Sequence, residues 1–560
     1  MDGYYGLANV EYYKLESINN QHKSINDVAA ADARVAKHMF VSIFPPRHVS
    51  IILPGPLPLP FIECSYMFMS DTKEQFALLQ QKYGDFCEMY LNGVRNIVIS
   101  RPEYLETMLT ASSKDPTFLL RLPYTEALEE FGMAGKGIIA NHNVNSWKFN
   151  RHFFNQAILS PSFNHEIVEW ADKLFPEFDD YLKSLANSSL SGDNLQDNNN
   201  WSLEIDLATW IRRFTNDMFV VLITGERSYS MASYYNTLSP IKVSRSGTLI
   251  QDSEKFIQSV GDHVRGLTFF IYLGSFYRHY VPPYKYQVKE LLDNRDYLFD
   301  LIDNMIKERR KKIEETPIGA KLGHDMLTSL ITANTERDIN NTKKVEGDMS
   351  RPMSDIEIRG NLLDAFLGGT DTISTTFAFI CYYLCLYPQV KQKMVAEIDS
   401  IFPSNIPFNM TYNDLLKLKY CDAVIKESNR IRPVGNEFPR YVENPCEVGG
   451  YHWDENIVFH INLNGIHWHK DHWSNPEIFD PERFYEKDYK SRHKFALVTF
   501  GAGLRNCPGK KLAMVEILSL LVLLFRKYDI ELVDINAPLK VKSGIINLVE
   551  EMNVRIWPRN

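Results

Sequence analysis

The stretch Phe500-Gly501-Ala502-Gly503-Leu504-Arg505-Asn506-Cys507-Pro508-Gly509 carries the strongest indication of what this chain does. It places a cysteine in a glycine-rich turn, where Gly503 and Gly509 lack side chains and let a flat ligand approach the backbone closely. The apolar periodicity after the turn predicts a helix from Lys510 to Lys527. Because the positive end of that helix would face the sulfur and lower its pKa, Cys507 is predicted to act as a thiolate. The alternative is a buried, inert structural cysteine.

The spacing Phe-x-x-Gly-x-Arg-x-Cys-x-Gly is complete in this stretch and resembles the haem-binding loop of the cytochrome P450 family. The resemblance implies that Cys507 is the axial ligand of the iron of haem b (iron protoporphyrin IX), with Phe500 and Arg505 as further cofactor contacts. Thiolate ligation favours O–O cleavage. The implied fold is mainly α with a smaller β-rich part (α+β), in which a long central helix lies over the haem and the cysteine loop lies beneath it.

A second pattern predicts an unusually long helix. Ser354-Asp355-Ile356-Glu357 has the spacing of a capping box, and the apolar pattern continues from there to Tyr387. Pro388 ends this helix or opens the next one. Gly368 and Gly369 weaken the helix by about 1 kcal/mol each relative to alanine. Such local inconsistencies tend to mark functional sites.

The segment Gly368-Gly369-Thr370-Asp371-Thr372 resembles the oxygen-activation motif of the same family. O₂ activation consumes protons, and a hydroxyl with an adjacent carboxylate can relay them from solvent. Asp371 and Thr372 are therefore the predicted catalytic pair. The alternative is that Thr372 hydrogen-bonds to a carbonyl of its own helix and that Asp371 is simply exposed.

A third pattern is structural. Glu427 and Arg430 lie three residues apart on a helix predicted from Lys417 to Ile431, and Arg483 follows in Pro481-Glu482-Arg483-Phe484. The order and spacing of the three resemble the family's Glu–Arg–Arg network, which locks the segment beside the haem. A buried network of this kind holds only if every charge is paired.

Three further residues resemble positions that contact the haem edge and its propionates. They are Trp147 and Arg151, spaced Trp-x-x-x-Arg, and Arg440, which follows Pro439. Arginine suits a carboxylate by charge and by bidentate geometry. For the two arginines, exposed salt bridges are the alternative. The histidines in the segment from His467 to Trp473 could bind metal, but the segment resembles a structural part of the family and is predicted to be structural.

Composition and charge restrict the function classes. The chain has 560 residues, 44% of them hydrophobic, and a net charge of −9, which does not favour a nucleic-acid partner. Its seven cysteines form no CxxC pair, which suits a reducing compartment, and Cys381 and Cys385 are predicted to be core thiols. The polar stretches 187–200 and 334–353 are predicted to be surface loops.

The chain is divided into an N-terminal extension of unknown role, residues 1–53, and one haem-thiolate monooxygenase domain, residues 54–560. The first 53 residues contain no run of 18 or more apolar residues and no convincing signal peptide. Microsomal members of the family usually carry an N-terminal membrane helix, so the sequence departs from their pattern. The resemblance implies the cytoplasmic face of the endoplasmic reticulum membrane, with the cytoplasm as the alternative and peripheral membrane contact left open.

Basic residues flank the cysteine loop and indicate an electron partner. Lys490, Lys494, Lys510 and Lys511 are predicted to attract, as a group, an acidic surface of an NADPH-dependent flavin reductase, which the resemblance implies as the partner. A solvated charged surface is the alternative.

The predicted function is a monooxygenase that uses O₂ to hydroxylate or otherwise oxidise an apolar small molecule such as a fatty acid, a sterol or a xenobiotic. Expected walls of the substrate pocket are Phe366, Leu367, Val434 to Phe438 and the region from Leu119 to Met133. The aromatic stretch from Thr268 to Tyr277 either packs on the core or forms an access segment. Two other functions stay open, namely a haem-thiolate isomerase or dehydratase acting on hydroperoxides and a non-catalytic haem sensor or carrier.

Overall fold

The computed structural model describes residues 52–59, 63–68, 73–110, 116–189, 201–245, 247–340, 350–485 and 492–559. Its α-helices are α2 (Lys73–Tyr83), α3 (Glu106–Leu109), α4 (Glu126–Glu130), α5 (Val144–Ile158), α6 (Pro161–Ser189), α7 (Leu207–Thr224), α8 (Ser230–Leu238), α9 (Ser253–Tyr272), α10 (Ser275–Tyr280), α11 (Pro282–Glu315), α12 (Met326–Thr332), α13 (Asp355–Leu386), α14 (Pro388–Ile401), α15 (Tyr412–Leu415), α16 (Lys419–Ile431), α17 (Leu463–His467), α18 (Glu482–Tyr485) and α19 (Lys510–Lys527). The strands are β1 (Phe86–Leu91), β2 (Val94–Ile99), β3 (Leu203–Asp206), β4 (Glu437–Val442), β5 (Cys446–Val448), β6 (Tyr451–Trp453), β7 (Ile457–Asn462), β8 (Tyr528–Leu532), β9 (Lys540–Ser543), β10 (Asn547–Glu551) and β11 (Asn553–Pro558).

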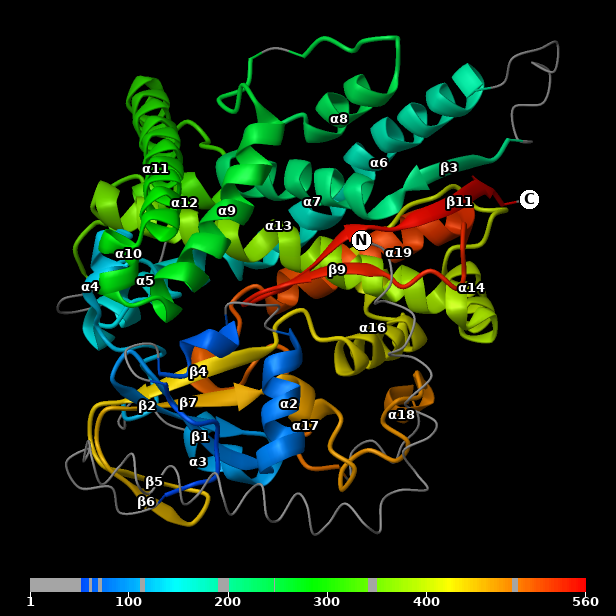
Figure 1. The fold of residues 1–560 in the computed structure, drawn as a ribbon. Helices are drawn as coiled ribbons and strands as arrows, with labels where there is room; N and C mark the ends of the chain where they lie inside the picture. Colours follow the sequence, from blue (N-terminus) through cyan, green and yellow to red (C-terminus); the bar gives the residue numbers. More distant parts are fainter. Residues whose placement is uncertain are drawn as a thin grey trace.

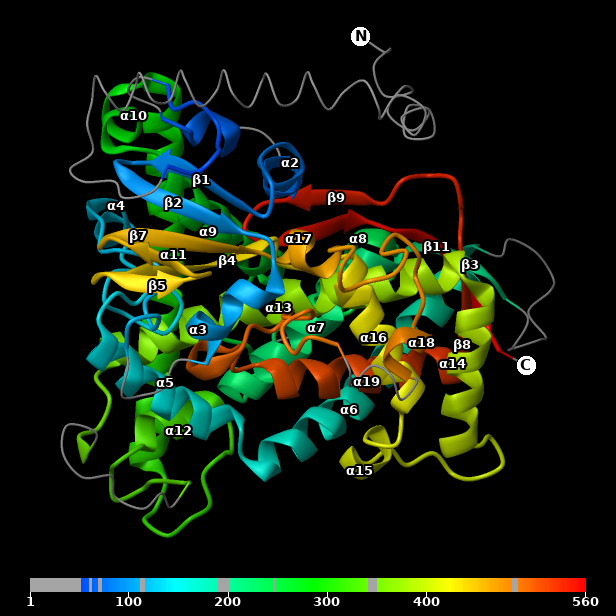
Figure 2. The ribbon, with the colours of Figure 1, turned by 90° about the horizontal axis from the view of Figure 1, so that it is seen from below.

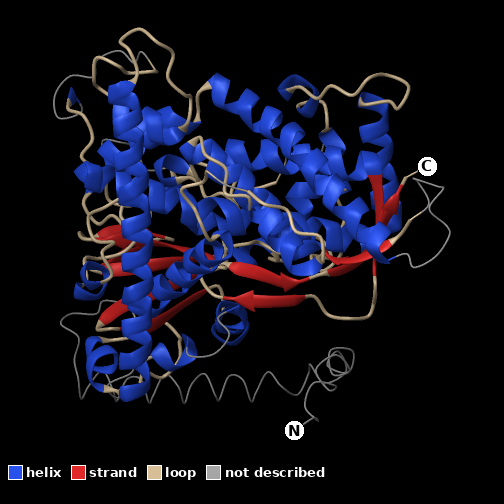
Figure 3. Ribbon diagram, turned by 90° about the horizontal axis from the view of Figure 1, so that it is seen from above, coloured by secondary structure: helices blue, strands red, loops and turns tan. Residues whose placement is uncertain are grey.

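The strands form a smaller part beside the helices, which confirms the predicted fold class. Strands β1, β2, β7 and β4 make a sheet in that order, with β2 and β7 parallel and the other neighbours antiparallel. Figure 1 shows this sheet together with α2 and α17 at one side of the molecule, and Figure 3 shows the strands as a layer along the helical part. A second sheet has the order β3-β11-β8, and β9 with β10 and β5 with β6 form hairpins.

Helix α13 is the long helix that the sequence predicts, and it crosses the interior of the molecule (Figure 2). Ser354 is its N-cap, and the capping box with Glu357 is complete. The helix runs through Gly368 and Gly369 without a break. At Gly369 a side chain would collide with the Phe219 ring of α7, so the close packing of α7 on α13 requires a glycine there.

The other predicted helices are also present. The helix after the cysteine, α19, has the predicted bounds, and Pro388 is the first residue of α14. Helix α16 begins at Lys419, two residues later than predicted. The reason is that the N–H groups of Lys417 and Leu418 donate to carbonyls of α15, so these residues belong to the preceding turn.

The cysteines are all free thiols. Cys381 and Cys385 are buried in α13, as predicted, and the Cys385 thiol contacts the carbonyl oxygen of Ile530 at 3.8 Å. Burial raises the pKa of both thiols, that of Cys385 to about 12.

Among the described residues, no single helix has the length and apolar composition to cross a membrane. One pair, α13 and α14, meets that test jointly, with a bend of 114° between them. Several predictions fall outside the described residues. These are almost all of the N-terminal extension, most of the first polar stretch, residues 341–349 of the second, and Lys490.

Candidate active site

The cysteine loop is held in shape by close backbone contacts. Gly501 and Gly503 have positive φ angles of 64° and 68°, and a side chain at Gly503 would collide with the carbonyl of Leu109. The N–H group of Cys507 donates to the carbonyl oxygen of Phe500 at 2.8 Å. The loop therefore presents the cysteine in one defined position.

The protonation of the thiol differs from the prediction. Burial raises the pKa of Cys507, although the N–H groups of Gly509 and Lys510, together with Arg121 and Arg151, act to lower it. The start of α19 thus acts in the predicted direction, but desolvation outweighs it. A bound metal ion would reverse this balance, because a coordinating thiol loses its proton outright.

A cavity of about 290 Å³ opens above Cys507, here called the inner cavity. It brings together most of the predicted haem contacts and one member of the predicted catalytic pair. Its lining includes Arg121, Ile138, Arg151, Phe154, Ala365, Gly368, Thr372, Val434, Gly435, Phe438, Arg440, Phe500, Arg505, Cys507 and Ile546. The region from Val434 to Phe438 lines it as predicted, but Phe366 and Leu367 do not. Phe366 instead packs edge-on against Phe256 of α9.

Four arginines lie around the inner cavity. Arg151, Arg440 and Arg505 were expected there; Arg121 comes from the region between Leu119 and Met133 that was expected to contribute to the pocket wall, but it was not predicted as a cofactor contact. Burial lowers the pKa of all four, that of Arg151 to about 10 and that of Arg440 to about 9. The guanidinium groups also repel one another, since Arg121 lowers the pKa of the other three.

Several of their N–H groups have no protein partner. The Nε atoms of Arg121, Arg151 and Arg505 and one terminal nitrogen of Arg505 are buried without a hydrogen bond. Trp147 lies beneath Arg505, with 4.5 Å between the guanidinium carbon and the ring centroid, and its own Nε1 is also unpaired. Buried donors of this kind normally have a partner. The cluster therefore fits an anionic ligand.

Two carboxylates also line the cavity, and both are engaged elsewhere. Asp364 accepts hydrogen bonds from the N–H groups of Ile138 and Ile139, and burial raises its pKa to about 6. Glu437 pairs with Nδ1 of His460 at 3.1 Å. The four arginines bring four positive charges to the cavity and the two carboxylates bring two negative ones, so a ligand with two negative charges would balance the cluster. A flat ligand with two carboxylates and an atom that binds a thiolate, such as haem with its two propionates, matches this site.

The predicted catalytic pair is divided between two cavities. Thr372 lines the inner cavity, and its hydroxyl donates to the carbonyl oxygen of Gly368 at 2.6 Å, which was the alternative considered for it. Asp371 points to the other side of α13 and is buried, so the alternative of a simply exposed carboxylate is wrong. Arg212 of α7 holds it with two hydrogen bonds of 2.6 and 3.1 Å.

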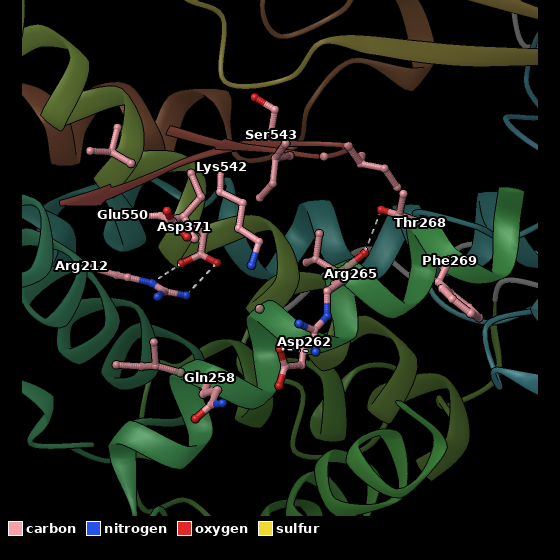
Figure 4. Close-up of a pocket in the computed structure, with 18 of the residues that line it drawn as sticks. Arg212, Gln258, Asp262, Arg265, Thr268, Phe269, Asp371, Lys542, Ser543 and Glu550 are labelled. Carbon is pink, nitrogen blue, oxygen red and sulfur yellow. Dashed lines mark hydrogen bonds and ion pairs between the residues drawn. The ribbon is translucent and has the colours of Figure 1, made fainter. Parts of the chain in front are cut away.

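The second cavity, here called the outer cavity, has a volume of about 820 Å³ and lies between α7, α9, α13 and the β9–β10 hairpin. Figure 4 shows the Arg212–Asp371 pair at its wall. Gly261 of α9 lies against this pair, and a side chain there would come within 3.3 Å of the Arg212 guanidinium. The Thr268–Tyr277 stretch contributes both to this cavity, through Phe269 and Tyr272, and to the core, through the buried ring of Phe270.

The three residues of the predicted Glu–Arg–Arg network are in contact with one another through the Glu427 carboxylate. Arg430 donates to both carboxylate oxygens of Glu427 at 2.7 and 2.8 Å, and neither side chain is exposed to solvent. Arg483 approaches the same carboxylate at 3.4 Å, and the N–H of Asp480 donates to it at 2.9 Å. Further hydrogen bonds join Arg430 to the carbonyls of His467 and Ile478. The network thus ties α16 to the segment that leads to the cysteine loop.

The histidine segment makes contacts that hold loops together. Nε2 of His467 accepts a hydrogen bond from the N–H of Val498 at 3.0 Å, and Nε2 of His469 lies 3.1 Å from a carboxylate oxygen of Asp85. Near the start of α19, Lys510 and Lys511 are exposed, whereas Lys494 is paired with Glu106 at 2.5 Å.

Comparison with known proteins identifies the family. A family model described as Cytochrome P450 matches residues 53–552. Among curated relatives, the chain is 25% identical to (+)-vincadifformine 19-hydroxylase of Catharanthus roseus, covering 89% of this chain and 91% of the relative. It is 24% identical to Cytochrome P450 3A9 of Rattus norvegicus, covering 91% and 92%. It is 27% identical to a steroid 17-alpha-hydroxylase/17,20 lyase of Mesocricetus auratus, covering 86% and 87%.

Solved structures agree on the fold. The crystal structure of the cytochrome P450DA heme domain superposes with a TM-score of 0.68 at 17% identity, covering 92% of this chain and 99% of that one. A second cytochrome P450 crystal structure superposes with a TM-score of 0.69 at 18% identity, covering 91% and 100%.

Proposed function

The chain belongs to the cytochrome P450 family of haem-thiolate monooxygenases, and from this premise we propose that it takes electrons from an NADPH-dependent flavin reductase to oxidise an apolar small molecule with O₂. The observation that carries the proposal is that Cys507, Thr372 and four arginines line one cavity. A non-catalytic haem carrier would have no need for a hydroxyl that faces the ligand beside a neighbouring carboxylate.

We propose haem b as the cofactor. Cys507 would bind its iron, Arg121, Arg151 and Arg505 would bind its propionates through the N–H groups that lack a protein partner, and Arg440 would add a further positive charge at the same cavity. Cys507 is the one cysteine among the lining residues described, so the site offers no second thiol for covalent attachment of the porphyrin. When bound, the haem supplies the redox chemistry that activates O₂.

The two residues of α13 have separate parts in proton supply. The Thr372 hydroxyl donates a hydrogen bond to the carbonyl oxygen of Gly368, so its oxygen lone pairs remain to accept a hydrogen bond from a water in the inner cavity. Asp371 faces the outer cavity, where solvent can protonate it once it separates from Arg212. The Arg212 pair therefore controls when Asp371 is free to take part in proton transfer towards Thr372.

Electron supply is the second part of the proposal. Lys510 and Lys511 lie at the start of α19, directly after the cysteine loop, and both are exposed. An acidic reductase surface bound there would approach the thiolate side of the haem. Lys494 belongs to the same predicted group but would have to leave Glu106 to contact a partner.

The substrate class is proposed from the character of the inner cavity. Ile138, Phe154, Val434 and Phe438 give it a mostly apolar wall, which suits a fatty acid, a sterol or a xenobiotic.

We further propose that residues 54–560 form one haem-thiolate domain. Its proposed location is the cytoplasmic face of the endoplasmic reticulum membrane, and residues 1–53 are assigned no role.

The test uses the full-length haem-loaded protein. The reduced carbonyl complex should show the red-shifted Soret band of a haem-thiolate. With reductase and NADPH, a library of apolar compounds should yield products that contain one atom of isotopically labelled O₂. Conversion of a hydroperoxide without NADPH, and without incorporation of the label, would replace the monooxygenase with an isomerase or dehydratase.

A further inference from the structure

The outer cavity adjoins the inner one and differs from it in character. It follows one side of α9, from Glu254 to Leu273, and the β9–β10 hairpin covers it on the opposite side. Ile546, near the tip of the hairpin, lines both cavities. The two cavities therefore share a wall at this side chain, and a substrate that spans both would have to pass it.

Most charged groups in the outer cavity are already paired. Arg212 is bound to Asp371, Arg213 to Glu254 at 2.5 Å, and Arg265 to Asp262 at 3.1 Å. These three pairs contain six of the eight charged residues that line the cavity. A charged ligand would have to break a pair to use them, so they do not define the charge that the cavity accepts.

The two remaining charges lie at different places along the hairpin. Lys542 stands opposite Leu548 in the strand register, close to the tip that carries Ile546. Glu550 lies at the irregular end of the hairpin, where it acts with Glu551 to raise the pKa of Lys540. Glu550 thus lies near Lys540, whose ammonium group is paired with Glu551, whereas Lys542 forms no ion pair with any residue that the structure describes.

The side chain of Lys542 points into the outer cavity. Figure 4 shows its side chain extending from β9 into the cavity, between the Arg212–Asp371 pair and the Arg265–Asp262 pair. One arginine therefore lies on each side of the Lys542 ammonium group, which forms no ion pair with a described carboxylate. An incoming cation would be repelled by Lys542 and would find Asp371 and Asp262 already paired with arginines, whereas an incoming anion would complete the pairing of Lys542.

We propose that the outer cavity binds the carboxylate of a monoanionic, otherwise apolar substrate, and that Lys542 is the residue that binds it. The inference rests on the proposed function, because it assigns the substrate of the inner cavity. One ammonium group offers one positive charge, which matches a carboxylate better than a doubly charged phosphate. With its head held beyond Ile546, the substrate enters the inner cavity tail first, so the carbon presented above Cys507 is remote from the carboxylate.

The experiment compares ligands that share one chain and differ in the head group. Equilibrium dialysis measures the binding of decanoate, decanol and decyl phosphate to the haem-loaded, full-length protein. The wild type should bind decanoate more tightly than decanol and decyl phosphate. Lys542→Met should weaken decanoate binding about fivefold, the size expected for a partly screened ion pair, and leave decanol binding unchanged.

The matched control is Lys540→Met on the same strand, which removes a lysine that is paired with Glu551 and does not line the cavity. It should alter the binding of neither decanoate nor decanol. Equal affinities of the wild type for decanoate and decanol would overturn the proposal, as would an equal loss of both in Lys542→Met. Tighter binding of decyl phosphate than of decanoate would reassign the head group as a phosphate.

Failure of this inference can be told apart from failure of the proposed function. The Soret band of the reduced carbonyl complex and the NADPH-dependent incorporation of labelled O₂ are measured on the same preparations. If both are present and the head group makes no difference to binding, only the assignment of the outer cavity is wrong.

Discussion

Replacing Glu427 by glutamine should destabilise the protein strongly, because the substitution removes the one negative charge that faces two buried arginines. The hydrogen bond from Nε of Arg430 to Oε2 would be lost, because an amide NH₂ group cannot accept it, while the amide oxygen in place of Oε1 could still accept from Arg430 and from the N–H of Asp480 without carrying a charge. Hydrogen bonds to charged groups are worth about 1.5–3 kcal/mol each. Breaking a buried pair by removing one partner costs about 3–5 kcal/mol. Since Glu427 and Arg430 are both fully buried, we expect a loss of about 3–5 kcal/mol.

The same helix supplies the control. Lys426 and Asp422 form an ion pair at 2.6 Å with about a third of each side chain exposed, so Lys426→Met should cost less than about 1 kcal/mol. The assay follows urea unfolding of the haem-loaded protein through loss of the Soret band of the reduced carbonyl complex. Glu427→Gln should also yield a smaller haem-loaded fraction, because the network joins α16 to the segment before the cysteine loop.

A double variant identifies the origin of the loss. If an uncompensated Arg430 charge causes it, Glu427→Gln combined with Arg430→Met should recover part of the stability that Glu427→Gln loses. Recovery would be incomplete, since Arg430 also donates to the carbonyls of His467 and Ile478. Equal urea midpoints for Glu427→Gln and Lys426→Met would refute the reasoning.

Cys507→Ala should abolish the red-shifted Soret band of the reduced carbonyl complex, measured by absorbance, and a band like that of the wild type would show that another residue binds the iron. Thr372→Val keeps the side-chain shape and should retain haem but divert reducing equivalents to hydrogen peroxide, measured as the ratio of peroxide to NADPH consumed. Thr215→Val on α7, which removes a buried hydroxyl bonded within its own helix, is the control, and equal ratios in both variants would exclude Thr372 from proton supply. Gly369→Ala should lower the urea midpoint, because its methyl group collides with Phe219. Gly368→Ala meets no atom within 4 Å, so it should leave the free energy of unfolding unchanged or raise it by up to about 1 kcal/mol through helix propensity. A similar loss in both glycine variants would mean that the local backbone, not Phe219, sets the requirement.

The sequence predicts those parts of the site whose residues lie close together in the chain. The loop from Phe500 to Gly509 and helix α19 are contiguous, and the capping box of α13 spans four residues. The Glu427–Arg430 pair could be predicted because a spacing of three residues places two side chains on one face of a helix. In each case the local geometry of the backbone determines the contact.

Contacts between distant segments could not be predicted in this way. Arg212 lies 159 residues before Asp371, and no local spacing connects the two. Arg121 belongs to an irregular segment between α3 and α4, where no periodicity indicates the direction of a side chain. The pKa of the thiol was predicted from the helix alone, whereas its direction depends on the burial that the whole fold imposes.

The glycines of α13 show that an unfavourable residue in a helix does not by itself reveal why it is there. Gly369 is required by packing, since α7 leaves no space for a side chain there. No atom lies within 4 Å of the position of a side chain at Gly368, and this residue lines the inner cavity. Its carbonyl oxygen accepts the hydrogen bond of the Thr372 hydroxyl, so Gly368 contributes to the site and not to helix packing. Asp371 and Thr372 are adjacent in sequence, and adjacent side chains on a helix point about 100° apart. One helix can therefore separate the outer cavity from the inner one and still carry, in two consecutive residues, a group that faces each.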